Sequence, residues 1–168
     1  NSVKLRKIKK FEIILDKTKI SRTETAKFLG VVIDENLSWK HHINYIKGKI
    51  AKSVGILKRL KYRLPENTLN TLYNTLVFPY LNYCNIIWAN NKPTRLKSLL
   101  VLQKRAMRVI TNSPYNTHAL PLFFKLNQLT IYDINKLLIA TFMFRHHRNC
   151  LPSIFSGYFC LNSTIHNH

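Results

Sequence analysis

Two short β-favourable runs open the chain, and the spacing of apolar residues then changes to that of helices. Residues 11–15 predict a first strand, and Asp16-Lys17-Thr18 predicts a turn after it. Residues 27–33 predict a second strand, in which Gly30 indicates a bulge or a close approach of backbone. The two runs together predict a short antiparallel β-hairpin. Residues 34–36, Asp-Glu-Asn, then provide a turn with the character of a helix N-cap.

A long amphipathic helix is predicted after Leu37. On an ideal helix with about 100° per residue, six aliphatic side chains fall within a sector of roughly 80° and are expected to face a core. These six are Ile43, Ile46, Ile50, Val54, Leu57 and Leu64. The opposite side carries Tyr45, Lys49, Lys52, Arg59 and Arg63, with Gly48 and Gly55 beside them. Bare backbone next to cations would let a phosphate chain come close, although a solvated lysine face with two incidental glycines is the alternative.

Proline divides the rest of the chain into shorter helices, because it is tolerated in a first helical turn and breaks a helix interior. Helices are predicted over residues 66–77, from near Pro93 to Ile110, over 120–126 and over 131–147. In the helix from Pro93, a second row of cations lies opposite the apolar face, at i, i+7 and i+11. This row consists of Lys97, Lys104 and Arg108, and the apolar face consists of Leu96, Leu99, Leu100, Ala106, Met107 and Ile110.

The last predicted helix carries apolar positions at helical spacing, and the chain after it becomes polar. The spaced positions are Ile134, Leu137, Leu138, Thr141 and Phe142. Residues from 150 onward are expected to be a frayed or truncated tail. The predicted fold class is therefore α+β and mainly α, with a short antiparallel hairpin followed by a helical bundle.

Charge narrows the choice of partner. The chain has 27 Lys and Arg against 7 Asp and Glu, a formal net charge of +20. Such a field recruits polyanions through counterion release, so nucleic acid is the expected partner. Between Lys40 and Arg108 there are fourteen basic residues and one acid, Glu66. An ordinary solvated surface mixes both signs of charge, so this imbalance favours a polyanionic partner. The alternative interpretation is a charged, solvated face that has no partner.

The sequence gives less support to a membrane-spanning protein or to a secreted protein held by disulfides. No run approaches the roughly 20 apolar residues of a membrane-spanning helix, and the three cysteines lack a paired spacing, which favours a reducing compartment. The chain begins at Asn1 without an initiator Met and is interpreted as a fragment.

Three motifs carry a family resemblance. The first is Phe28-Leu29-Gly30-Val31 with Asp34, Leu37, Trp39 and His42-Ile43; the second is Leu64-Pro65 with Pro79, Leu81, Tyr83 and Trp88; the third is Gln103-Lys104-Arg105-Ala106 with Arg108 and Ile110. In this order they resemble the region that follows the catalytic palm in reverse transcriptases of non-LTR (LINE-type) retrotransposons. The resemblance covers about residues 11–149. Cys84 and Ala89 stand where related enzymes often have glycine, which puts local turn geometry in doubt.

The resemblance implies roles that charge and periodicity do not. Phe28, Leu29, Gly30 and Val31 correspond to the primer grip, and the helices correspond to the thumb beside the template-primer duplex. Residues 1–36 are then the end of the palm, 37–149 the thumb-like region and 150–168 the tail. The implied partners are an RNA-DNA or other nucleic-acid duplex and the upstream palm and fingers of the same polyprotein, without a membrane. The implied location is an intracellular ribonucleoprotein, nuclear or cytoplasmic.

Catalysis by this chain alone is not expected. By resemblance the full-length polymerase needs Mg²⁺, which takes carboxylates converging from neighbouring strands, and no Asp-Asp pair is present. The adjacent Asp34 and Glu35 point opposite ways on an extended chain. We therefore expect no catalytic residue, no metal site and no cofactor in this fragment. A zinc set drawn from His146, Cys150, Cys160, His166 and His168 lacks a close Cys-x-x-Cys spacing, so surface histidines are the favoured interpretation.

The leading hypothesis is a fragment of an RNA-directed DNA polymerase that binds the duplex through its sugar-phosphate backbone. The predicted nucleic-acid-binding residues are Tyr45, Lys49, Lys52, Arg59, Arg63, Lys97, Lys104 and Arg108. A free-standing basic helical module that binds nucleic acid is the first alternative. The second is an interaction segment over residues 40–64 that binds an acidic partner or an anionic membrane surface. It ranks last, because the apolar stripe is aliphatic and lacks the Trp and Phe typical of such membrane helices.

Overall fold

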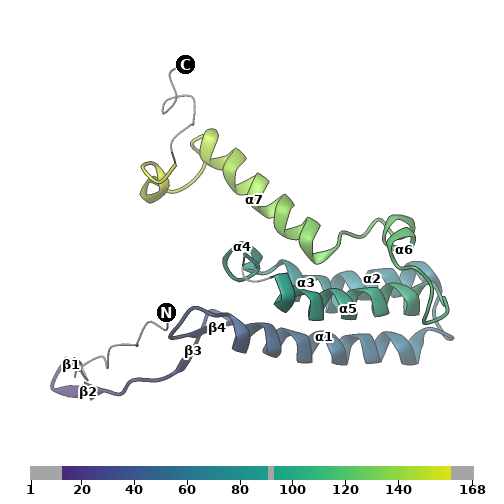
Figure 1. Cartoon of the computed structure of the whole chain (residues 1–168), viewed down its shortest axis with the longest axis horizontal. Coiled ribbons are helices and arrows are strands. Elements are labelled where there is room, and N and C mark those ends of the chain that lie inside the picture. The colour runs from purple at the N-terminus through teal and green to yellow at the C-terminus, as the bar shows by residue number, and fades with distance from the viewer. Residues whose placement is uncertain (1–12, 91–92, 160–168) are drawn as a thin grey trace, which may run out of the picture.

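The computed structural model describes residues 13–90 and 93–159. Two antiparallel hairpins open this part of the chain (Figure 1). Strand β1 (Ile13–Leu15) pairs with β2 (Thr18–Ile20), and β3 (Thr25–Phe28) pairs with β4 (Val31–Asp34). The turn expected at residues 16–18 is confirmed, and residues 11 and 12 of the predicted first strand lie outside the described residues. Each hairpin is local, so the two predicted strands do not pair with each other.

The single strand predicted over residues 27–33 is wrong. The chain reverses at Leu29 and Gly30, whose φ angles are 46° and 83°. Positive φ at both central residues is what a two-residue hairpin turn of type I′ needs, and glycine adopts it without steric cost. Gly30 is therefore a turn residue between β3 and β4 and not a bulge inside one strand.

Seven α-helices and one 3₁₀ turn follow within the described residues. They are α1 (Lys40–Leu60), α2 (Glu66–Leu76), α3 (Phe78–Asn82), α4 (Asn85–Trp88), α5 (Pro93–Ile110), α6 (Leu120–Lys125), α7 (Ile131–His147) and the 3₁₀ turn η1 (Ser153–Phe155). Pro79 lies in the first turn of α3, so the break that it predicts after α2 is confirmed. The mainly helical α+β fold class is confirmed as well.

Helices α1, α2 and α5 pack side by side and form the body of the molecule (Figure 1). Helices α1 and α5 run in the same direction, and α2 runs against them. At one end Arg95 donates a hydrogen bond to the carbonyl of Ser38. At the other end Lys61 Nζ lies 3.1 Å from Asn112 Oδ1. The two longest helices are thus tied to each other at both ends.

The predicted apolar stripe of α1 faces the core. Ile43, Ile46, Ile50, Val54 and Leu57 are all buried, and Leu64, beyond the end of α1, is half-buried. On α5 the buried residues are Leu96, Leu99, Ala106, Met107 and Ile110, while Leu100 is half-buried. Trp88 and Tyr73 are the largest fully buried side chains of this core. Two amphipathic helices were predicted, each with an apolar face toward the core and cations on the opposite side. The burial of the two apolar faces is confirmed.

A buried glutamine ties three parts of the fold together. The amide nitrogen of Gln103, on α5, donates to the hydroxyl of Tyr73 on α2 at 2.9 Å and to the carbonyl of Leu129 at 3.1 Å. Its amide oxygen accepts the backbone N–H of Ile131 at 2.7 Å, at the start of α7. Burial raises the pKa of Tyr73 to about 12, against a smaller lowering by the Gln103 hydrogen bond.

Helix α7 begins in the core and then leaves the body (Figure 1). Ile131 and Ile134 are buried, but Leu137 is 55% exposed and Thr141 is exposed. The predicted bounds of this helix are confirmed, while its apolar spacing does not mark a continuous core face. Within the expected tail, the rings of Phe155 and Phe159 lie 5.5 and 6.0 Å from that of Phe142 on α7.

Candidate nucleic-acid interface

The β3–β4 turn is held against the helices by a buried carboxylate and a tyrosine. Asp34, at the end of β4, accepts the backbone N–H groups of Ser38 at 2.9 Å and Trp39 at 2.8 Å, just before α1. Burial acts to raise the pKa of Asp34, but hydrogen bonds led by those from Ser38 outweigh it and lower the pKa below its usual value. The hydroxyl of Tyr83 donates to the carbonyl of Leu29 at 2.7 Å. The turn is thereby fixed relative to α1 and to the segment between α3 and α4.

The four primer-grip-like residues divide into an exposed tip and a buried anchor. Phe28 is 64% exposed and Leu29 is 72% exposed, at the outer end of the hairpin. Val31 is 6% exposed and packs on the body. Phe28 and Leu29 therefore present two large apolar side chains to solvent at the tip of the hairpin.

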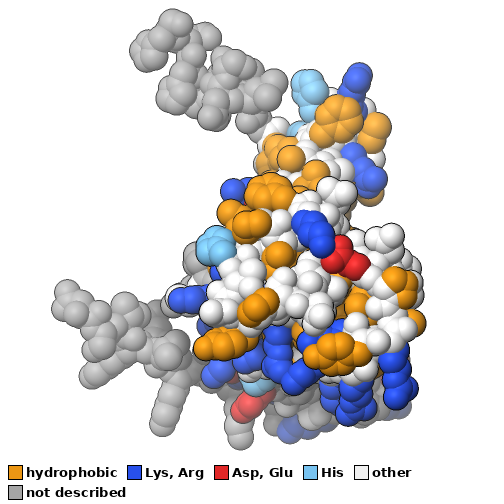
Figure 2. Space-filling model, turned by 90° about the vertical axis from the view of Figure 1, so that its right-hand side faces the viewer, with side chains coloured by type: hydrophobic (Ala, Val, Ile, Leu, Met, Phe, Trp, Pro, Cys, Tyr) orange, Lys and Arg blue, Asp and Glu red, His pale blue; other side chains and the backbone are white. Residues whose placement is uncertain are grey.

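The cations predicted on the first long helix are exposed to solvent. Lys49, Lys52 and Arg59 lie on α1, and Arg63 lies in the turn just beyond its end. A Cβ atom added at Gly48 or at Gly55 would meet nothing within 4 Å, so the backbone there is open to solvent. In Figure 2 Lys and Arg side chains gather along the lower part of the molecule, at the level of α1 in Figure 1. We call these four cations the α1 basic face.

Tyr45 lies at the edge of the α1 basic face. Its side chain is 36% exposed. The ammonium groups of Lys27, on β3, and Lys49 lie 5.2 and 5.7 Å from the centre of its ring. Cations at this distance from an aromatic ring are attracted by its π-electrons, so Tyr45 links the hairpin to the α1 basic face.

The cations predicted on α5 differ in their exposure to solvent. Lys97 and Lys104 are exposed, whereas Arg108 is half-buried. The Nε atom of Arg108 donates to the carbonyl of Thr117 at 2.8 Å. Lys104 and Arg108 line a hollow of about 330 Å³ together with His118. Arg108 thus holds the loop before α6 and contributes its charge from a fixed position.

Packing also creates a basic groove that the sequence did not predict. Between α1 and the start of α5 lies a hollow of about 380 Å³. Its polar lining consists of Lys40, Asn44, Lys47, Thr94, Arg95 and Ser98. Lys40 and Lys47 are seven residues apart, so the sequence alone could have placed them on one side of α1. Their proximity to Arg95 depends on the packing of α1 against α5, which spacing along one helix does not show.

Four acidic side chains of the described residues are engaged by other groups of the fold. Glu35 is paired with Arg22, and Glu66 with Lys125 at 2.7 Å. Asp34 is occupied by backbone N–H groups, and Asp133 accepts from the hydroxyl of Thr130 at 2.6 Å. Within residues 13–90 and 93–159, no three His, Cys, Asp or Glu side chains are placed to hold a metal ion.

The zinc set considered from the sequence is tested only in part. Cys160, His166 and His168 lie outside the described residues. The ring of His146 lies 5.0 Å from that of Phe159, and Cys150 is exposed with a free thiol. In the part of the chain that the structure describes, no helix has both the length and the apolar character to cross a membrane.

Curated relatives of this chain are polymerases of mobile elements, and the relationship is one of distant homology to non-LTR retrotransposon reverse transcriptases. The chain is 26% identical over 129 residues to the probable RNA-directed DNA polymerase from transposon X-element of Drosophila melanogaster, an alignment covering 74% of this chain. It is 29% identical over 117 residues, 68% of its length, to the corresponding polymerase from transposon BS of the same fly. A third relative is the RNA-directed DNA polymerase from mobile element jockey of Drosophila funebris, 25% identical over 99 residues, which is 57% of this chain and 11% of that polymerase.

The chain spans a small part of these relatives. The alignments cover 14% of the X-element polymerase and 13% of the BS polymerase. No family model matches the chain, and no solved structure matches it. The resemblance seen in the sequence is therefore supported as a distant relationship over most of this chain.

Proposed function

We propose that this chain is part of an RNA-directed DNA polymerase of a non-LTR retrotransposon, in which its helices bind the sugar-phosphate backbone of the template-primer duplex. The β3–β4 turn acts as the primer grip and α1 to α7 act as the thumb. The chemistry, with its Mg²⁺, is supplied by carboxylates elsewhere in the polymerase.

Two independent observations on the same chain support this proposal. The distant homology to mobile-element polymerases extends over 74% of the chain, and the same chain presents a row of exposed cations next to open backbone on α1. Contacts of Lys and Arg to phosphates position a duplex without reading its sequence, which is the task of a polymerase thumb. The homology favours this function over a free-standing basic module, which shares only the charge argument.

The first hairpin supports a place inside a larger polymerase. Ile13, Ile14, Leu15 and Ile20 are each 49% to 65% exposed. A two-stranded hairpin with apolar side chains in water is marginally stable alone. We propose that the upstream palm of the same polyprotein covers these side chains.

Salt dependence of binding tests the backbone contact. Engagement of about six phosphates predicts a slope of log K against log salt near −5 for an RNA-DNA duplex. Replacing the α1 basic face, Lys49, Lys52, Arg59 and Arg63, by glutamine removes four contacts and is expected to flatten the slope by about 3.5.

A matched variant separates specific contacts from net charge. Lys17, Lys136, Arg145 and Arg148 are exposed cations on the first hairpin and on or after α7, away from the α1 basic face. Replacing these four by glutamine changes the net charge by the same amount and is expected to leave the slope within about one unit of the parent value. Equal slopes for the two variants, or a strong preference for one base sequence, would contradict the proposal.

A further inference from the structure

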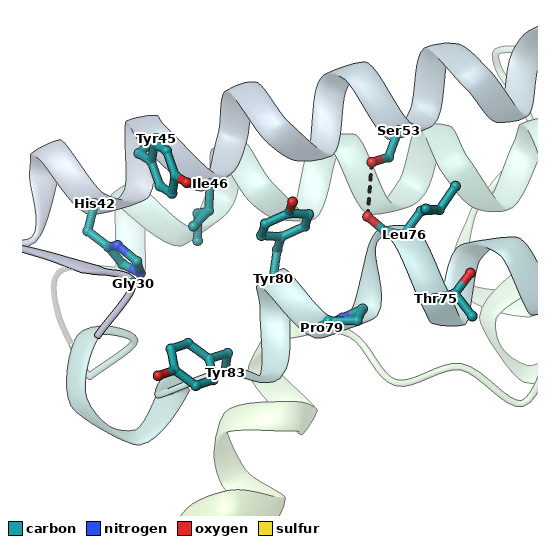
Figure 3. Close-up of a pocket in the computed structure, with 10 residues that line it drawn as sticks. All are labelled: Gly30, His42, Tyr45, Ile46, Ser53, Thr75, Leu76, Pro79, Tyr80 and Tyr83. Atoms are coloured by element: carbon teal, nitrogen blue, oxygen red, sulfur yellow. Dashed lines mark hydrogen bonds between the residues drawn. The ribbon is translucent and has the colours of Figure 1, made fainter. Parts of the chain in front are cut away.

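A pocket of about 450 Å³ lies beneath the β3–β4 turn, at the end of the α1 basic face (Figure 3). Its walls come from Gly30 in the turn, from α1, from the end of α2 and from the segment that contains α3. Three tyrosines line it, Tyr45 from α1, Tyr80 from α3 and Tyr83. The size falls within the range of small-molecule sites, and the lining combines aromatic rings with a few polar groups, as such sites do.

His42 supplies an unused hydrogen-bonding group to this pocket. The side chain is 2% exposed, and its Nδ1 atom accepts the backbone N–H of Val32 at 3.3 Å. An imidazole whose Nδ1 accepts carries its proton on Nε2 when neutral. Burial lowers the pKa of His42, which favours this neutral ring. The Nε2 atom is buried without a hydrogen-bond partner among the described residues, and in Figure 3 the ring lies beside Gly30 at the wall of the pocket, which His42 lines.

A buried donor without a partner destabilises the fold, and a ligand with an acceptor atom would remove this cost. The nearby groups define the rest of that ligand. In Figure 3 the hydroxyl of Tyr80 points toward α1 and the ring of Tyr83 closes the side below the turn. Lys27 and Lys49 lie at the ring of Tyr45 and place positive charge at this wall.

We propose that this pocket binds the base of an unpaired nucleotide at the end of a nucleic-acid strand. The base stacks on the tyrosine rings, one of its ring nitrogens or carbonyl oxygens accepts from His42 Nε2, and its phosphate lies near Lys27 and Lys49. Every base has a π-face and an acceptor, so the pocket discriminates an unpaired end from a paired one and not one base from another. The inference rests on the proposed function only in that the strand reaches the pocket along the α1 basic face.

Three duplexes test the pocket separately from the backbone contact. The probes are a blunt RNA-DNA duplex, the same duplex with one unpaired adenosine at its 3′ end, and the same duplex with an abasic residue in place of that adenosine. The duplex with adenosine is expected to bind about tenfold more tightly than the abasic one, as stacking of one base on an aromatic side chain provides. Equal affinities for these two would overturn the pocket proposal.

A pair of substitutions at His42 isolates the unused donor. In His42→Asn the amide oxygen takes the place of Nδ1 and keeps an acceptor for Val32 N–H, but the Nε2 donor is lost. In His42→Gln the amide nitrogen takes the place of Nε2. The preference for the adenosine end is expected to disappear in His42→Asn and to persist in His42→Gln, with binding of the blunt duplex unchanged in both. A preference that persists in His42→Asn would overturn the role of Nε2.

A measurement on the parent chain does not depend on whether these variants fold. Nitrogen-proton NMR of the histidine rings follows the Nε2 signal of His42 while adenosine 5′-monophosphate is added. We expect this signal to shift on addition of the nucleotide and to stay in place on addition of ribose 5-phosphate, which has no base. A shift with both compounds, or a shift with protein concentration alone, would overturn base binding in favour of an anion site or of contact between copies of the chain. A His42 shift without any binding of blunt duplex would reject the proposed function and keep the pocket.

Discussion

The buried amide of Gln103 offers the sharpest test of how the helices are held together. Replacement by leucine keeps the approximate volume but removes one acceptor and two donated hydrogen bonds. It leaves the N–H of Ile131 and the hydroxyl of Tyr73 without their partner in buried surroundings, whereas the carbonyl of Leu129, a residue 42% exposed, can bond to water instead. A buried polar group that loses its partner costs more than the hydrogen bond contributed, because water cannot replace it.

The magnitude follows from the two buried groups, the N–H of Ile131 and the hydroxyl of Tyr73. Each costs about 1–3 kcal/mol when unsatisfied, while the apolar leucine side chain recovers about 1 kcal/mol through burial. We expect Gln103→Leu to lower the free energy of unfolding by about 3 kcal/mol, equivalent to a fall in Tm of about 6–12 °C for a chain of this size. Tyr73→Phe removes one of the three contacts and is expected to cost about 1 kcal/mol.

Thermal and urea unfolding measure these changes, and Gln128→Leu is the matched control. Gln128 is half-buried and donates to Asn70 Oδ1 at 3.0 Å, so the same substitution there is expected to cost less than about 1 kcal/mol. Hydrogen exchange at the Ile131 amide gives a local readout, which should accelerate more than that of amides inside α1. A loss in Gln103→Leu no greater than in Gln128→Leu would refute the argument that this amide joins α2, α5 and α7.

Four further predictions concern the turn, the titrating groups and catalysis. The lowered pKa of Asp34 makes it stabilising above its unfolded pKa and less so as pH falls through the folded value, so Asp34→Asn should flatten the loss of Tm as pH falls below 3.8, the usual pKa of this carboxyl. With a folded pKa of about 12 against 10.0, Tyr73 loses its stabilising effect as pH rises through that interval, and Tyr73→Phe should reduce alkaline unfolding there. Gly30→Ala should lower stability by about 1–2 kcal/mol in urea unfolding, because its φ of 83° strains any side chain. The purified chain should incorporate no dNTP on a primed RNA template with Mg²⁺, and incorporation abolished by Asp34→Ala would refute this.

The sequence predicted the features that depend on a single helix. The apolar stripe from Ile43 to Leu57 and the bounds of the last helix follow from periodicity, because one face of a helix must be buried whatever covers it. The Leu29–Gly30 reversal was missed because a run of β-favourable residues hides a turn when only one of its two central positions is glycine. The exposed half of α7 was missed because spacing shows which residues share a face and not whether anything packs on it.

The candidate site could be predicted only in its separate parts, and the reason is physical. Charge and spacing identify the α1 basic face, since its cations lie on one helix or in the turn directly after it. The groove of Lys40, Lys47 and Arg95 and the pocket around His42 each need two or more elements brought together. His42 would ordinarily be assigned to the core from its burial alone. The structure adds that Val32 bonds to one ring nitrogen, that the other has no partner among the described residues, and that the side chain lines a cavity. Together these make the buried histidine a candidate for binding rather than for packing alone.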